Sequence, residues 1–278
     1  MNTGTTRRGF FGGSLALAGL PAAASHALAA EGTGDIKIGV ASYSLRNFSR
    51  PVAIEMLKKL NVNYISIKEF HLRYAETAAQ TTAGAKEFRD AGFTILSGGN
   101  IDLKKPGELR RMFDYAKAAG MPMMVCAPAH ATLAEVEKLV KEYNIKAAIH
   151  NHGPEDKEFP TPESVLDAVK NMDPRMGLCM DIGHSARAGS DILKATESAG
   201  ARLLDIHTKD LIDIKDGKAT QVAVGDGALP IVPLFKLLKR MKYQGGVMLE
   251  YEINANDPLP GMERSLSFER GVLAGLRG

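Results

Sequence analysis

Histidines and carboxylates gather where short β-rich runs of this chain end. The imidazoles at such ends are His71 after YISIKEF, His150 and His152 in AAIHNHG, His184 in LCMDIGH, and His207 in LLDIHTKD. Asp181 and Glu250 occupy the same kind of position, in LCMDIGH and VMLEYE. Imidazole nitrogens and carboxylate oxygens are the usual ligands of borderline divalent ions. The pattern therefore predicts a metal site, provided that the ends of these runs meet in space.

The elements that must bring them together are alternating strands and helices. From Asp35 onward, we expect eight strands at 36–44, 64–70, 93–99, 121–128, 146–151, 176–182, 202–207 and 245–252, with amphipathic helices between them. Strands alternating with helices of this size form parallel βαβ units, and eight units in one chain predict an α/β fold of the (β/α)₈ TIM-barrel type. The turn after the first strand carries no G-x-G-x-x-G motif, which disfavours a doubly wound nucleotide-binding sheet.

One connection departs from the repeating unit. The segment 211–230 is too long for a plain loop after the seventh strand and holds two short strand-like runs around Asp216 and Gly217. We interpret it as a hairpin insertion over the mouth of the active site. The single barrel domain is expected to span 31–278.

In such a barrel, reactive groups lie at the carboxyl ends of the strands. Asp181, His207 and Glu250 end strands six, seven and eight, and strand five offers His150 and His152, which face the same side. A lone histidine there is more often structural, and Asp181 could be a helix N-cap. Four ligands on consecutive strands instead predict one divalent ion, with Mn²⁺ expected first and Zn²⁺, Fe²⁺ and Co²⁺ as alternatives.

These motifs resemble a known family. D-I-G-H at 181–184, H-T-K-D at 207–210 and a glutamate closing the eighth strand are similar to the xylose-isomerase-like TIM-barrel superfamily, in its sugar phosphate isomerase/epimerase branch. Its members include ketose 3-epimerases, inosose dehydratases and hydroxypyruvate isomerases, which bind a metal through Glu, Asp, His and Glu. The resemblance implies His150, Asp181, His207 and Glu250 as ligands here, with His150 standing in the place of the first glutamate.

This replacement bears on the reaction. Family epimerases use the two glutamates as paired acids and bases, and a histidine bound to metal cannot also accept a proton. We therefore expect His152 to transfer the proton, with Glu69 and Glu252 as alternatives. Glu250 matches the family's eighth-strand glutamate, and the resemblance implies a catalytic role for it as well as metal binding. Lys209 resembles a family position that contacts sugar hydroxyls or stabilises negative charge. We expect substrate contacts from four further residues, namely His71, His184, Arg187 and Glu252.

The leading functional hypothesis is a metal-dependent sugar isomerase or epimerase that acts by enolisation next to a carbonyl of a keto- or aldo-sugar. Its rival is a lyase or hydratase that eliminates across a 3-keto-glycoside or a cyclitol. A non-catalytic periplasmic sugar-binding protein is a third alternative. An apurinic-site endonuclease needs a further Asp-x-His pair, and here Asp226 comes without the histidine. A homo-oligomer stays an open alternative.

The N-terminal residues predict export. Arg7 and Arg8 precede a mildly apolar stretch that ends in the small-x-small site Ala27-Leu28-Ala29, which resembles a twin-arginine signal peptide over 1–30. Gly19 and Pro21 interrupt the stretch, so we expect cleavage and a periplasmic protein rather than a membrane anchor.

Charge and cysteine content limit the partners. Removing the two signal arginines changes 35 basic and 32 acidic residues to 33 and 32, a nearly neutral protein with no basic cluster for nucleic acid. Cys126 and Cys179 are expected in strands that are not neighbours, too far apart for a disulfide, so we predict two free buried thiols.

Overall fold

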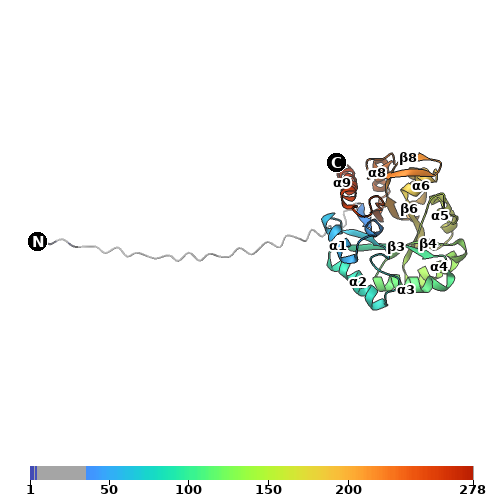
Figure 1. The fold of residues 1–278 in the computed structure, drawn as a ribbon, viewed down its shortest axis with the longest axis horizontal. Coiled ribbons are helices and arrows are strands. Elements are labelled where there is room, and N and C mark those ends of the chain that lie inside the picture. The colour runs from blue at the N-terminus through green and yellow to red at the C-terminus, as the bar shows by residue number, and fades with distance from the viewer. Residues whose placement is uncertain (3, 5–35, 278) are drawn as a thin grey trace. The chain divides into compact units, whose positions relative to one another are not determined.

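Eight parallel strands close into a barrel in the computed structural model of the protein (Figure 1), which describes residues 1, 2, 4 and 36–277. Around the barrel the order is β1, β10, β7, β6, β5, β4, β3, β2. The barrel strands are β1 Lys37–Ala41, β2 Tyr64–Ile67, β3 Thr94–Leu103, β4 Met123–Pro128, β5 Lys146–His150, β6 Met176–Asp181, β7 Leu203–Thr208 and β10 Gly246–Leu249. The predicted (β/α)₈ fold is confirmed.

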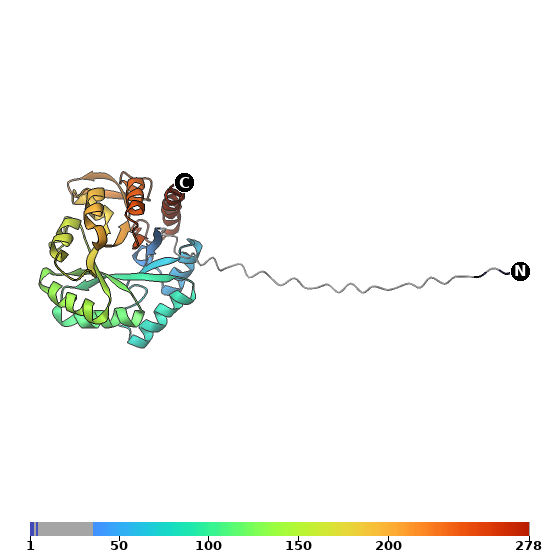
Figure 2. The ribbon, with the colours of Figure 1, turned by 180° about the vertical axis from the view of Figure 1, so that it is seen from behind.

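Helices connect the strands and surround them on the outside (Figure 2). They are α1 Arg50–Lys59, α2 Ala78–Asp90, α3 Leu109–Ala119, α4 Leu133–Tyr143, α5 Pro162–Val169, α6 Ile182–Arg187, α7 Ile192–Ala199, α8 Ile231–Arg240 and α9 Leu259–Gly275. Local sequence sets their ends: Thr161 caps α5 in a reciprocal capping box with Ser164, and α3 stops at Gly120, whose φ of 64° suits glycine. No helix in the described part of the chain is both long and apolar enough to cross a membrane.

Alternation along the strands decides which side chains reach the interior of the barrel. Ala148 of β5 and Cys179 of β6 pack together with Met123 and Val125, whereas their neighbours Ile149 and Met180 join the larger core toward the helices. His150 and Asp181 each stand two residues beyond these interior positions, and therefore also face inward.

The free, buried thiols predicted at Cys126 and Cys179 are confirmed. The two residues belong to different hydrophobic clusters, Cys126 to the outer core and Cys179 to the barrel interior.

The insertion after the seventh strand is the predicted hairpin. Strands β8 Asp210–Lys215 and β9 Lys218–Val222 pair antiparallel and form a separate two-stranded sheet. Asp216 and Gly217 at its tip have φ values of 51° and 75°, which match a tight two-residue hairpin turn.

Several predicted strands are longer than the observed ones. β1 stops at Ala41 and is followed by a 3₁₀ turn at Ser42–Leu45, β2 stops at Ile67, and β10 stops at Leu249. Glu69 and His71 consequently lie in a loop, and Glu250 is the first residue past its strand. The reverse holds for β3, which continues to Leu103 beyond the predicted end at 99. The predicted export motif and cleavage site lie outside the described residues.

Candidate metal centre

Four side chains converge at the carboxyl end of the barrel: His150, Asp181, His207 and Glu250. They come from β5, β6, β7 and the end of β10, which are neighbours in the closed sheet. One ligand atom from each lies within 4.8 Å of those of the others. His150, Asp181 and His207 are buried, and Glu250 is partly open to the cavity. This is the ligand set that the sequence predicted.

The buried imidazoles lack partners for their nitrogens. Among the described residues, neither ring nitrogen of His150 or of His207 has a hydrogen-bond partner, although both rings are buried. His150 Nε2 lies 3.5 Å from Asp181 Oδ2, and His207 Nδ1 lies 3.4 Å from Glu250 Oε2. Unpaired buried nitrogens are costly, and a divalent ion between them and the carboxylates would satisfy both sets. The residues therefore fit a metal ion with two nitrogen and two oxygen ligands.

Cys179 also lies near the two imidazoles and forms a second group with His150 and His207. Burial raises the pKa of its thiol to about 12. Only a thiolate is a good metal ligand, so the carboxylate-containing group is the better candidate.

Asp181 serves two purposes at once. Its Oδ1 accepts a hydrogen bond of 2.8 Å from the backbone N–H of His184 and so caps α6, while Oδ2 faces the ligand cluster. Asn151 fixes the backbone on both sides, because its side chain accepts from the N–H of Asp181 and donates to the Asp181 carbonyl. The N-cap alternative considered for Asp181 and the ligand role are thus compatible.

Lys209 places an ammonium against the carboxylates. Its Nζ lies 3.0 Å from Asp181 Oδ2, 2.9 Å from Glu250 Oε2 and 2.9 Å from Glu252 Oε2. Burial alone would raise the pKa values of Asp181 and Glu250, but the charge of Lys209 and the neighbouring histidines together outweigh burial and hold both pKa values well below their ordinary range. Both carboxylates are therefore ionised, as metal ligands must be.

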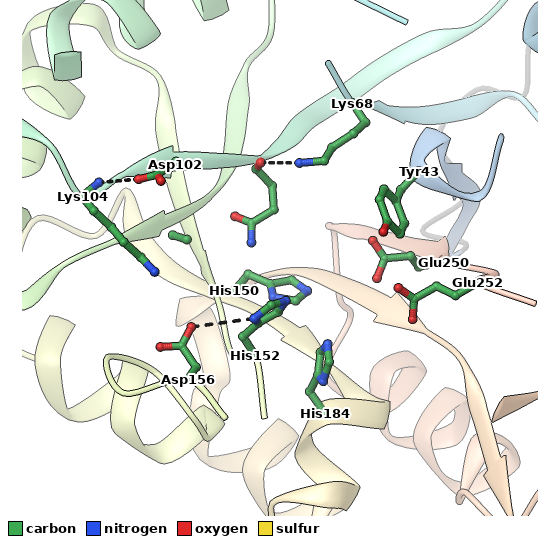
Figure 3. Close-up of a pocket in the computed structure, with 12 residues that line it drawn as sticks. Tyr43, Lys68, Asp102, Lys104, His150, His152, Asp156, His184, Glu250 and Glu252 are labelled. Atoms are coloured by element: carbon green, nitrogen blue, oxygen red, sulfur yellow. Dashed lines mark hydrogen bonds and ion pairs between the residues drawn. The ribbon is translucent and has the colours of Figure 1, made fainter. Parts of the chain in front are cut away.

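A cavity of about 340 Å³ opens above this cluster (Figure 3). Five predicted site residues line it: His150, His152, His184, Glu250 and Glu252. The polar residues that sequence reasoning missed are Tyr43, Lys68, Asn100, Asp102, Lys104 and Asp156. Three of these come from the extension of β3 and the residue just beyond it, so the prediction of a shorter strand hid them. Hydrogen-bonding groups on all sides suit a ligand rich in hydroxyls.

His152 stands at the cavity wall and is paired with a carboxylate. Its side chain is 54% exposed, and its Nδ1 lies 3.8 Å from Asp156 Oδ2. Backbone N–H groups of Glu158 and Phe159 donate to Asp156 Oδ1, and despite partial burial they hold the pKa of Asp156 below its ordinary value. An ionised carboxylate on this side favours a proton on Nδ1 and leaves Nε2 free to accept one. The four-residue spacing from His152 to Asp156 was the available sequence signal for this pair.

The imidazole of His184 is neutral and can donate a hydrogen bond. Burial lowers its pKa to about 4, and Arg187 Nη1 lies 3.3 Å from its Nδ1. Because a guanidinium has only donors, Nδ1 must accept, which leaves the ring proton on Nε2. The His184 ring centroid lies 4.7 Å from that of His152.

Two predicted roles, those of His71 and Glu69, need correction. His71 does not line the cavity: it is buried, and its nitrogens pair with Ser42 Oγ and the Leu45 carbonyl, so it braces the turn after β1. Glu69 also lies outside the lining and pairs with Lys68 at 2.9 Å, because β2 ends before it. Arg187 lines an adjoining cavity with His184, Lys209 and Glu252, and its donors bond Gly217, Glu155 and His184, so its predicted contact with substrate stays a prediction.

Two side chains hold the backbone that presents Glu250 and Glu252. Gln221 of the hairpin donates to the Glu250 carbonyl at 3.0 Å and accepts from the Glu252 N–H at 3.2 Å. Ser44 Oγ donates to the Leu249 carbonyl and accepts from the Tyr251 N–H. The segment past β10 is thus fixed without further strand pairing.

Known proteins share this fold. Inosose dehydratase of Glaesserella parasuis serovar 5 is 27% identical over 135 residues, which is 42% of this chain and 45% of that protein. The chain therefore matches less than half of the length of that curated relative. The solved IOLI protein with a bound zinc atom has a TM-score of 0.71 at 17% identity, covering 86% of this chain and 99% of that one. D-psicose 3-epimerase of Clostridium cellulolyticum H10, solved with D-tagatose, has a TM-score of 0.69 at 16% identity over 86% and 99%.

A family model also matches most of the chain. The model of the xylose isomerase-like TIM barrel family matches residues 54–270, which include all four candidate ligands. The chain belongs to the xylose isomerase-like TIM barrel family.

Proposed function

We propose that this protein is a divalent-metal-dependent enzyme that removes a proton next to the carbonyl of a keto- or aldo-sugar, as an isomerase or epimerase. One observation supports this most: four converging ligands with unpaired buried nitrogens lie at the base of a polar cavity that also holds His152 beside the Asp156 carboxylate. When bound, the metal ion would polarise a carbonyl oxygen and so acidify the neighbouring C–H bond.

The residues of the cavity divide the remaining tasks. His152 Nε2 accepts the proton from carbon, and Asp156 stabilises the resulting imidazolium. His184 Nε2–H donates to a substrate oxygen and stays neutral while doing so, because its pKa is about 4. Glu250, which Lys209 and His207 hold in the ionised form, is a weak base, so a single base serves the reaction. Isomerisation follows when His152 returns the proton to the adjacent carbon and the proton of the neighbouring hydroxyl passes to the former carbonyl oxygen, which converts that hydroxyl carbon into the new carbonyl.

A second reaction uses the same first step. If a hydroxyl or other leaving group stands β to the carbonyl, its loss after proton removal gives a lyase or dehydratase acting on a 3-keto-glycoside or a cyclitol. The similarity to an inosose dehydratase favours this candidate, and so does the presence of His150 in place of a second glutamate base.

Metal analysis followed by proton exchange tests the proposal. The purified protein should contain about one divalent ion per chain, with Mn²⁺ expected first, and Asp181→Ala should lose both the ion and the activity. In D₂O, NMR of free ketoses and 3-keto-glycosides should show deuterium entering next to the carbonyl. An isomer as product identifies the first reaction, and an unsaturated product with a released group identifies the second. A metal-free protein with full activity would refute both.

We also propose that the protein is exported to the periplasm through a twin-arginine signal. Arg7, Arg8 and the Ala27-Leu28-Ala29 site support this proposal. Replacing both arginines with lysine should leave the precursor in the cytoplasm. An unchanged yield of cleaved protein in the periplasm would contradict this route.

A further inference from the structure

We infer that Lys209 and Glu252, which are not ligands, set the affinity of the metal centre in opposite directions. Lys209 competes with the ion for the two ligand carboxylates, and Glu252 is the counter-ion that relieves this competition. The inference rests on the proposed metal site but not on the identity of the sugar. It concerns only how readily the site takes up and retains its ion.

The competition follows from which oxygens Lys209 contacts. Asp181 Oδ2 is the oxygen nearest His150 Nε2, and Glu250 Oε2 is the one nearest His207 Nδ1. The Lys209 ammonium lies 3.0 and 2.9 Å from these same two oxygens. An ion bound by the cluster would therefore share both oxygens with a second positive charge. Like charges at this separation repel strongly in a buried site.

The lysine cannot avoid this position by turning toward solvent. Lys209 is only 4% exposed, and its stem passes directly over Gly183. A Cβ added at Gly183 would lie 2.7 Å from both Cγ and Cδ of Lys209. The glycine of the D-I-G-H motif thus leaves the space through which the lysine of the H-T-K-D motif reaches the carboxylates. The two motifs fit each other as one unit.

Glu252 gives the ammonium a partner that is not a ligand. Its Oε2 lies 2.9 Å from Lys209 Nζ, and its side chain is 38% exposed. With Asp181, Glu250 and Glu252 ionised and Lys209 protonated, the group carries a net charge of two negative units, which matches a divalent ion. Without the lysine the charge becomes three negative units, and without Glu252 it becomes one. Metal affinity should rise in the first case and fall in the second.

Cobalt(II) alone is a suitable probe, because its visible d–d bands report binding without substrate or turnover. We would titrate the metal-free protein at one fixed pH, using a competing chelator where binding is tight. The dissociation constant of Lys209→Met should be at least about tenfold lower than that of the unmodified protein, and that of Glu252→Gln at least about tenfold higher. Lys236→Met is the matched control, because Lys236 is exposed on the outer helix α8, and it should leave the constant unchanged.

The outcomes separate the two proposals. If the unmodified protein binds no cobalt, the metal centre itself is refuted. If it binds cobalt but Lys209→Met binds equally or more weakly, Lys209 holds the carboxylates in place rather than competing for them, and the inference is wrong. An unchanged constant in Glu252→Gln also overturns it. Circular dichroism of each variant checks folding, and Lys209→Gln repeats the test if the methionine variant does not fold.

Discussion

The pairing of His152 with Asp156 is the feature of single residues on which the proposed chemistry depends. Asp156 is fixed by two backbone N–H groups, and its second oxygen lies 3.8 Å from His152 Nδ1. An imidazole oriented by a carboxylate in this way is a common general base. It is also the only one of the four clustered histidines whose side chain is mostly exposed to the cavity.

Replacing His152 with Gln should lower turnover by roughly a hundredfold or more while leaving metal content unchanged, because the residue accepts the proton without binding the ion. Incorporation of solvent deuterium into substrate measures the step directly. His130→Gln is a matched control, since His130 is 55% exposed and pairs with Glu158 outside the cavity. Near-normal deuterium incorporation in His152→Gln would place the base elsewhere, with Glu252 the next candidate.

For single residues, their types and spacing predicted which four side chains converge, but not how the positions of His150 and His152 would differ. The two face the same side in the sequence pattern, and they differ only because β5 ends at His150. The first is buried at the base of the cavity and the second stands at its wall. The three-carboxylate environment of Lys209 could not be predicted, because it depends on contacts between separate strand ends.

Among the elements, the β8–β9 hairpin acts as a brace for the end of β10. Gln221 bonds the backbone on both sides of Tyr251, and at the hairpin tip the Gly217 carbonyl accepts from Arg187 at 2.7 Å. The hairpin therefore links the α6 side of the site to the segment that carries Glu250 and Glu252. This explains how an insertion outside the barrel sheet can support the ligands.

Replacing Gln221 with Ala removes both hydrogen bonds and should loosen Glu250. We expect about tenfold weaker metal binding, because groups that orient ligands commonly contribute that much. We also expect about 1 to 2 kcal/mol less stability, from two lost hydrogen bonds. Calorimetric metal titration and urea unfolding measure the two effects. Gln244→Ala is the control, as the Gln244 side chain donates to the Lys242 carbonyl away from the metal centre, and its backbone bond with Lys37 is unaffected by the change. Equal metal affinity in both variants would show that the hairpin does not brace the site.

The hairpin itself was predicted from the length of the segment and the Asp216-Gly217 turn, and the structure confirms it. Strand ends were predicted less well. An apolar run signals a buried strand, but its last residues can turn away, as after β1 and β2. The continuation of β3 alternates polar Asn100 and Asp102 with buried Ile101 and Leu103, a strand signal that follows two glycines and was missed.

For the molecule as a whole, one buried acid couples stability to pH. Glu269 of α9 is fully buried, and neither of its oxygens has a hydrogen-bond partner among the described residues. Burial raises its pKa from 4.5 to about 8. The folded protein therefore holds a proton that the unfolded chain releases. This contribution to stability is complete below about pH 4.5 and is lost as the pH rises to about 8.

Glu269→Gln keeps the shape and removes the proton, so it should be more stable than the unmodified protein at pH 9, by on the order of 4 kcal/mol. The gain should shrink toward pH 5. Thermal unfolding across this range measures it. Glu263→Gln, an exposed change on the same helix, should leave the curve unaltered. A pH profile of Glu269→Gln parallel to that of the unmodified protein would exclude Glu269 as the source.

Fold class was the most predictable property of the whole chain. Eight strand runs alternating with helix-period segments leave little freedom once parallel βαβ units are assumed, and barrel closure then places the ends of β5, β6, β7 and β10 side by side. The buried state of Glu269 had no such signal, because a single glutamate in an amphipathic helix is ordinarily exposed.

The most direct test of the metal centre is a crystal structure of the protein grown with Mn²⁺, with anomalous diffraction data collected on both sides of the manganese absorption edge. The account predicts one anomalous peak at the carboxyl end of the barrel, within about 2.0 to 2.3 Å of one atom each from His150, Asp181, His207 and Glu250. No peak at that position, or a peak bound by His152 in place of His150, would contradict it.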